Sequence, residues 1–255
     1  MRFTHRTLTV AIGAILLTGC QDSSRSDPQP DMGKDRSGAA MRVTDAGPQV
    51  TQNFRLADFT SISLTGGDDV KVRQGTRFQI SARGAERDLE QLVLRLESGK
   101  LLIGRKSGAA IKGDKIKIDI VMPALSGISV SGSGDLDAEM VSGDDIAISV
   151  TGSGDAKVDR LTASRASLHV SGSGDLEVKG GRIEKGDYRL TGSGDLDAGA
   201  LSAASLVIEA KGSGDVEAMA SGGAEVRSSG SGDVKMKGGA TCSVTQSGSG
   251  QIRCG

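Results

Sequence analysis

The chain has 255 residues, a formal net charge of −1 and 36% apolar residues, enough for one folded domain with additional tails. This balance of charge gives no basic surface for DNA or RNA, so we expect no nucleic-acid partner. With 38 Gly, no Trp, one Tyr and four Phe, the core must be thin and built mainly from aliphatic side chains.

The N-terminus is typical of an exported protein. Arg2 and Arg6 flank the start of the chain, and the apolar stretch that follows ends at Leu17, too short for a permanent membrane-spanning helix. The tetrapeptide Leu-Thr-Gly-Cys that ends at Cys20 resembles the lipobox of bacterial lipoproteins. The resemblance implies that residues 1–19 are a signal peptide and that the sulfur of Cys20 carries lipid. Because Gln21 follows, rather than Asp, it also implies the outer membrane of a Gram-negative cell.

Residues 20–50 are predicted to form a flexible tether. They contain three of the four prolines among Ser, Asp, Gly and Gln, and they show no sustained apolar period. We place the folded domain at residues 51–255.

Residues 51–125 are expected to cap the N-terminal end of this domain. The segment 92–103 reads as a hairpin whose turn is Glu97-Ser98-Gly99-Lys100, although residues 86–94 could instead begin as a short helical turn. Isoleucines at every second position from Ile116 to Ile120 predict a strand. One set of residues matches, 66 positions earlier, the repeat described next: Ile62, Leu64, Gly66, Asp69, Val70 and Val72.

Residues 126–255 are an array of repeats. The tetrapeptide Gly-Ser-Gly-Asp recurs in steps of 20 and then 18, and a final Gly-Ser-Gly-Gln at Gly248 loses the Asp. The six complete copies begin at Gly132, Gly152, Gly172, Gly192, Gly212 and Gly230.

Apolar and polar residues alternate on both sides of each tetrapeptide. The columns of one parity hold Val, Ile, Leu and Ala, and those of the other hold Ser and charged residues. Each unit therefore reads as a strand, a tight corner, a second strand and a variable return such as 141–145 or 179–187. We expect stacked units with parallel, in-register strands, an all-β solenoid, in which the corner glycines lie where a side chain would collide with the bend.

Several motifs resemble a known bacterial family. They are Gly-Gly-Asp-Asp-Val from Gly66, Glu-Ser-Gly-Lys-Leu from Glu97, Ile-Val-Met-Pro-Ala-Leu at 120–125 and Ser-Val-Ser-Gly-Ser-Gly-Asp-Leu from Ser129. In this order they resemble the auto-transporter adhesin head GIN domain proteins, from about residue 53 to the C-terminus. The resemblance implies a right-handed parallel β-helix on a cell-envelope protein, and it brings no catalytic residues.

One aspartate recurs in every complete unit. The simplest interpretation is that each carboxylate accepts hydrogen bonds from the backbone N–H groups of its own corner. The alternative is a row of weak calcium sites, because Ca²⁺ prefers oxygen ligands. The candidates are Asp135, Asp155, Asp175, Asp195, Asp215 and Asp233.

Cys242 and Cys254 align with Ala224 and Met236, which stand in inward columns. In an oxidising envelope compartment they are candidates for a disulfide that closes the C-terminal end, and otherwise they are two small buried thiols.

The pattern predicts a binding or structural module rather than an enzyme, because an active site gathers unlike residues whereas this chain repeats the same ones. We expect membrane attachment through Cys20, an unknown protein or polymer partner, and dimers through exposed strand edges as an option. The alternatives are a calcium-dependent spacer and a carbohydrate-active enzyme. The enzyme would use a carboxylate cluster drawn from Asp114, Asp119, Asp144 and Asp145.

Overall fold

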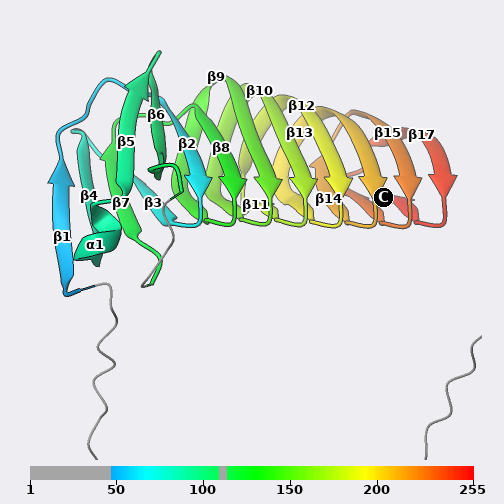
Figure 1. The fold of residues 1–255 in the computed structure, drawn as a ribbon. Coiled ribbons are helices and arrows are strands. Elements are labelled where there is room, and N and C mark those ends of the chain that lie inside the picture. Colours follow the sequence, from blue (N-terminus) through cyan, green and yellow to red (C-terminus); the bar gives the residue numbers. More distant parts are fainter. Residues whose placement is uncertain (1–46, 109–113) are drawn as a thin grey trace, which may run out of the picture. The chain divides into compact units, whose positions relative to one another are not determined.

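The computed structural model describes residues 47–108 and 114–255 (Figure 1). Of these described residues, 70% lie in strands and 2% in a helix. The signal peptide, Cys20 and most of the tether therefore lie outside the described residues. Within them, no helix is long and apolar enough to cross a membrane. The described residues confirm the predicted β-solenoid, with a repeat of roughly 20 residues and about six turns.

The N-terminal part contains seven strands and one short helix among the described residues. They are β1 (Gln49–Phe54), β2 (Ser61–Gly66), β3 (Asp69–Gln74), β4 (Gln79–Ala85), α1 (Glu86–Leu89), β5 (Leu92–Glu97), β6 (Lys100–Arg105) and β7 (Lys117–Met122).

The array follows as a succession of coils. Its strands are β8 (Gly127–Gly132), β9 (Leu136–Gly152), β10 (Ala156–Gly172), β11 (Leu176–Val178), β12 (Gly181–Gly192), β13 (Leu196–Gly212), β14 (Val216–Ala220), β15 (Gly223–Gly230), β16 (Val234–Lys237), β17 (Thr241–Gly248) and β18 (Ile252–Cys254).

Each coil has two sides that meet at the Gly-Ser-Gly-Asp corner, seen along the lower edge in Figure 1. We call the strands that lead into the corner the entry side and those that leave it the exit side. Neighbouring coils pair in parallel with the register that the repeat predicts: Leu136 lies opposite Ala156, and Gly152 lies opposite Gly172. The offset of 66 is confirmed too, because Ile62 pairs with Ile128 and Val70 pairs with Leu136.

The core lies between the two sides and is filled by the predicted inward columns. One coil contributes six fully buried aliphatic residues, at about 1.5 to 3 kcal/mol for each large one. In the first full coil these are Leu136, Ala138, Val141, Ile146, Ile148 and Val150.

The sequence predicted that a side chain at the corner glycines would collide with the bend of its own coil. The structure shows instead that it would collide with the neighbouring coil. The first glycine has a positive φ, +112° at Gly152, which favours glycine. A Cβ on the second glycine would collide with the preceding coil: on Gly154 it would lie 2.1 Å from the carbonyl oxygen of Gly134. Close stacking of coils therefore excludes side chains at both positions.

The variable returns are shorter than predicted. Residues 141–145 lie inside the continuous strand β9 and stay paired with β10, for example Val141 with Leu161. In the segment 179–187, Lys179 and Gly180 lie between β11 and β12, and β12 begins at Gly181.

Antiparallel strands close the N-terminal end. On the exit side, β7 pairs in parallel with β3 but antiparallel with β4, and β4 pairs antiparallel with β1. On the entry side, β6 stacks on β2 and pairs antiparallel with β5, which confirms the predicted hairpin. The helical turn is also present as α1, directly before β5.

Candidate functional site

The exit side carries a column of charged residues that runs along the described solenoid. Register places these side chains on one outward row, with neighbouring coils about 4.8 Å apart. From the N-terminal end the row is Asp119, Lys71, Asp137, Lys157, Glu177, Asp197, Glu217, Lys235 and Arg253. We call this row the charge column. Its signs alternate as far as Glu177, which begins a run of three acidic residues, and two basic residues end the row.

Ion pairs link neighbouring coils along this column. Lys157 Nζ lies 2.5 Å from Glu177 Oε2, and Glu217 contacts Lys235 Nζ at 3.1 Å and Lys237 Nζ at 2.7 Å. The hydrogen bond to Glu177 raises the pKa of Lys157, and those from Lys237 and Lys235 lower the pKa of Glu217. These side chains are all exposed by about a third or more, so each pair adds little to stability and the charges stay available to a partner.

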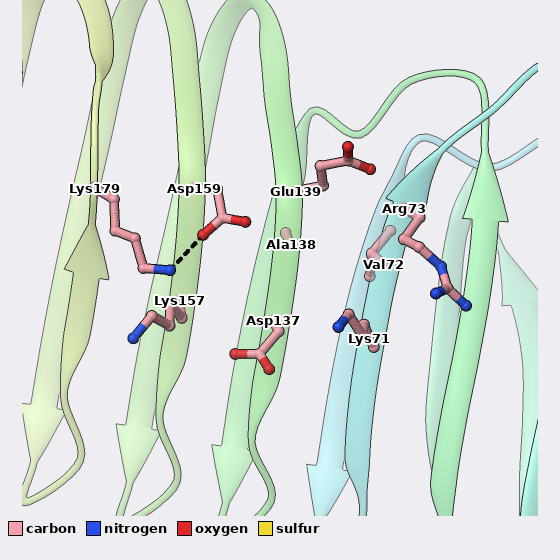
Figure 2. Close-up of a pocket in the computed structure, with 9 residues that line it drawn as sticks. All are labelled: Lys71, Val72, Arg73, Asp137, Ala138, Glu139, Lys157, Asp159 and Lys179. Carbon is pink, nitrogen blue, oxygen red and sulfur yellow. Dashed lines mark hydrogen bonds and ion pairs between the residues drawn. The ribbon is translucent and has the colours of Figure 1, made fainter.

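A hollow interrupts the charge column where the N-terminal part meets the array (Figure 2). The β3–β9 ladder ends at the pair of Val72 with Ala138, so the two strands diverge beyond it. The space has a volume of about 510 Å³. Its charged lining is Lys71, Arg73, Asp137, Glu139, Lys157, Asp159 and Lys179.

Opposite charges face one another in this hollow. Figure 2 shows Lys71 on β3 and Asp137 on β9 on opposite sides of the gap, and the ion pair of Lys179 with Asp159 at 2.6 Å. Arg73 turns away toward Asp119, which it contacts at 2.8 Å. The hollow is thus a mixed-charge surface suited to polar contacts rather than to an apolar ligand.

The repeated aspartates form a second, wholly acidic row beside the corner. Each Oδ1 accepts a hydrogen bond from the backbone N–H of the next coil, at 2.7 to 3.1 Å. For example, Asp175 accepts from the N–H of Asp195, and Asp233 accepts from the N–H of Gln251. The prediction that each carboxylate accepts hydrogen bonds from its own corner is therefore wrong, because the donor N–H lies one coil further along. We call this row the aspartate ladder.

The aspartate ladder and the acidic part of the charge column border one hollow of about 510 Å³. Its lining holds seven acidic residues and one lysine, so the local field is strongly negative. They are Asp135, Asp137, Asp155, Asp175, Glu177, Asp195, Asp197 and Lys157. Among the described residues, no three His, Cys, Asp or Glu side chains are grouped so that they could hold a metal ion. Calcium binding by the aspartate ladder stays a prediction.

The carboxylates considered for an enzyme lie in different places. Asp119 pairs with Arg73 on the exit side, and Asp145 forms a two-pronged contact with Arg165 at 2.5 and 2.8 Å near the return. Asp144 is exposed next to Asp145, and Asp114 is exposed next to the undescribed segment 109–113. The described structure brings no three of them together.

A buried ion cluster at the N-terminal end was missed by the sequence analysis. Arg105 donates from Nε and Nη2 to the two carboxylate oxygens of Asp68, at 2.9 and 2.5 Å, and Nη1 reaches Asp88 at 3.4 Å. The N–H of Ile116 also donates to Asp68. These contacts raise the pKa of Arg105, with the hydrogen bond that it donates to Asp68 as the main cause. The signal was present in Gly-Gly-Asp-Asp, where Asp68 occupies the place of the second corner glycine.

At the other end, the structure joins Cys242 and Cys254 by a disulfide. They pair in register with Ala224 and Met236, as the alignment placed them. Both are more exposed than those residues, because no further coil of the described residues packs on them.

A search of curated proteins found no match. Solved structures share the fold: a putative adhesin from Bacteroides fragilis has a TM-score of 0.74 at 22% identity, covering 80% of this chain and 96% of its own. A putative adhesin from Parabacteroides distasonis has a TM-score of 0.67 at 21% identity, covering 82% and 97%. A putative lipid binding protein from the same species has a TM-score of 0.64 at 22% identity, covering 81% and 96%.

The family comparison covers most of the folded part. The model of the family described as "Putative auto-transporter adhesin, head GIN domain" matches residues 58–240, which include the charge column from Lys71 to Lys235 and the whole aspartate ladder. The chain belongs to this family, whose adhesin-like character fits a cell-surface or envelope protein.

Proposed function

We propose that this protein is a non-enzymatic, adhesin-like binding module of the cell envelope, held to the outer membrane by lipid on Cys20. Family membership supports the adhesin-like role. The lipobox-like tetrapeptide and the Pro-containing stretch 20–50 support a lipid anchor followed by a tether.

The observation that carries the proposal is the charge column together with the aspartate ladder. Both repeat the same spacing coil after coil, so they present a long, regular surface rather than one cleft. A regular surface with charges about 4.8 Å apart suits a partner that is itself extended, such as a protein segment or a charged polymer.

The acidic hollow supports a partner of basic character. Seven carboxylates against one lysine attract positive charge, so we propose a partner that presents basic groups along its length. The absence of Trp from the sequence, and a single Tyr that is buried, argue against stacking on sugar rings.

A charge reversal tests this proposal. Glu177→Lys together with Asp197→Lys should abolish attachment of the expressing cells to the surface or cell type that the unmodified protein binds, and raised salt should weaken attachment of the unmodified protein. Glu184→Lys, an exposed charge reversal in β12 outside both rows, is the control and should retain attachment. Equal attachment of all three strains would contradict a binding role for the exit side.

Protease treatment of intact cells tests the location. If the tether lies outside the outer membrane, protease should release the domain from intact cells, and Cys20→Ser should remove it from the membrane fraction. Protection until the outer membrane is broken would contradict surface display and favour a periplasmic scaffold.

A further inference from the structure

Each carboxylate of the aspartate ladder is held by one oxygen and leaves the other exposed. Its Oδ1 accepts the backbone N–H of the next coil, at 2.7 to 3.1 Å, and this bond fixes the direction of the side chain. From Asp155 to Asp233, no hydrogen bond or ion pair within the described residues reaches Oδ2. The corner edge seen in Figure 1 therefore presents one oriented anionic oxygen per coil, and these oxygens are about 4.8 Å apart.

The first step of the same row already holds an ammonium group, which the chain itself supplies. Asp69 stands one coil before Asp135, because the residues that follow them, Val70 and Leu136, are paired. Lys115 Nζ lies between these two carboxylates, 2.9 Å from Asp69 Oδ1 and 3.1 Å from Asp135 Oδ2. The contacts raise the pKa of Lys115, with its hydrogen bond to Asp69 as the main cause. A cationic nitrogen therefore fits between two successive carboxylates, and on Asp135 it contacts the oxygen that stays without a partner in later coils.

The following steps of the ladder border the acidic hollow, where most carboxylates have no cation. Of the seven that line it, Asp135 is paired with Lys115. Glu177 is paired with Lys157, the single lysine of the lining, so five carboxylates have no ion pair within the described residues. The seat that Lys115 fills at the first step is thus repeated along the hollow, with no lysine of the described chain to fill it.

We propose that the aspartate ladder binds linear aliphatic polyamines, with successive ammonium groups seated between successive aspartates as Lys115 is seated between Asp69 and Asp135. Two amines joined by three methylenes are separated by four bonds of about 1.5 Å, which span about 5 Å in an extended zigzag. This spacing matches the coils, which are about 4.8 Å apart. Lysines on one face of an extended peptide are about 6.7 Å apart, because side chains alternate between faces, so they lose this register.

Binding should be weak and sensitive to salt. Each contact is an exposed ion pair, which contributes little by itself, so we expect a dissociation constant of about 0.1 to 1 mM for a tetramine at low ionic strength. Raised salt should weaken it, because salt screens exposed charges. The inference rests on the proposed function, since both use the acidic hollow, and it adds the class of ligand that the ladder itself would hold.

Isothermal titration calorimetry with spermine, a linear tetramine with spacers of three, four and three methylenes, tests the proposal. The protein is the processed chain, residues 20–255 with Cys20→Ser to prevent lipidation. NMR spectra of backbone amides locate the site: the N–H groups of Asp175, Asp195 and Asp215, which donate to the ladder, should shift on titration. Asp175→Asn with Asp195→Asn keeps both acceptors and removes two charges, so it should weaken binding at least about tenfold.

Asp144→Asn with Glu184→Gln is the matched control, because it removes the same charge from exposed positions in β9 and β12, outside both rows. It should bind spermine like the unmodified chain, and thermal melting checks that all variants are folded. Lys115→Met empties the first seat. It should therefore strengthen binding at least about twofold and extend the shifts to the N–H of Asp155, which donates to Asp135.

Absence of spermine binding, equal weakening by the control variant, or unchanged binding by Lys115→Met would each overturn the proposal. Acetylated and amidated tetralysine, which carries the same four ammonium groups, should bind more weakly than spermine; equal or tighter binding would overturn the match of spacing and assign the ladder to lysine-rich protein segments. If spermine does not bind but Glu177→Lys with Asp197→Lys still abolishes attachment, this inference fails and the proposed function stands. If spermine binds and attachment is unaffected by that reversal, the opposite holds.

Discussion

Removing the hydroxyl group of Tyr188 should stabilise the protein. This side chain stands in an inward column between Leu168 and Ile208, fully buried, and among the described residues its hydroxyl has no hydrogen-bond partner. Burial alone raises the pKa of Tyr188 above its usual range, so the group stays a neutral but unsatisfied donor. An unmet buried polar group costs about 1 to 3 kcal/mol. We therefore expect Tyr188→Phe to raise the free energy of unfolding by about 1 to 2 kcal/mol.

The neighbouring Gly186 explains how the ring fits. A Cβ there would lie 2.8 Å from Cε1 of Tyr188 and 2.4 Å from Cδ2 of Leu206, so Gly186→Ala should destabilise by about 1 to 3 kcal/mol. One coil earlier, the same two positions hold Ala166 and Leu168. The double variant Gly186→Ala with Tyr188→Leu copies that pair, so its loss should be smaller than the sum of the single losses by about 1 kcal/mol or more.

Urea unfolding followed by circular dichroism measures all four variants, with the midpoint compared at equal slope because long repeat arrays can lose two-state behaviour. In thermal melts, Tyr188→Phe should raise the midpoint by about 2 to 4 °C per kcal/mol. A destabilised Tyr188→Phe would refute the reasoning, since it would mean that the hydroxyl has a partner such as an ordered water. Additive losses for Gly186→Ala and Tyr188→Leu would refute the proposed fit of ring to glycine.

Three further changes have defined outcomes. Arg105→Met should lower the free energy of unfolding by about 3 to 5 kcal/mol in urea titration, because it leaves the buried carboxylate of Asp68 without its guanidinium; a loss below about 1 kcal/mol would contradict this. Asp175→Ala should cost about 1 kcal/mol by deleting one acceptor of the aspartate ladder, whereas Asp175→Asn keeps an acceptor, removes a charge and should be neutral or stabilising. Thermal melts of the unmodified protein with and without chelator test the calcium alternative. A lower melting temperature in chelator would support calcium binding by the aspartate ladder, and coinciding melts would contradict it. Because the pKa of Glu217 is lowered in the folded state, its carboxylate stabilises the protein above its unfolded pKa, and this stabilisation is lost as the pH falls through the lower folded value. The difference in melting temperature between the unmodified protein and Glu217→Gln should therefore shrink below about pH 4.5.

The sequence predicted the repeat and its register because both depend on spacing alone. Alternation identified inward columns such as Ile148 and Leu168, and the offset of 66 placed Ile62 opposite Ile128. These predictions hold because burial of every second residue and stacking at a fixed period leave few other arrangements.

Contacts between coils were harder to predict than the coils themselves. The pattern gave one Asp per corner, but it could not show that the donor to Asp175 is the N–H of Asp195 in the next coil. Likewise, the place of Asp119 in the charge column depends on β7 stacking beside β3, a pairing between segments with no shared motif. The alternation of apolar and polar residues shows which face of a strand a side chain lies on, but it does not show which neighbouring coil that side chain contacts.

Two departures from the corner tetrapeptide lie at the first and last described corners, and the stacking contacts explain both of them. The second corner glycine is needed only where another corner precedes it, so the first corner can hold Asp68 there and use its carboxylate to bind Arg105. The repeated Asp accepts the N–H of the following corner, and the last described corner, where the described residues offer no such N–H, holds Gln251. The interior coils keep the corner tetrapeptide and differ from one another in their outward charges, where we place recognition.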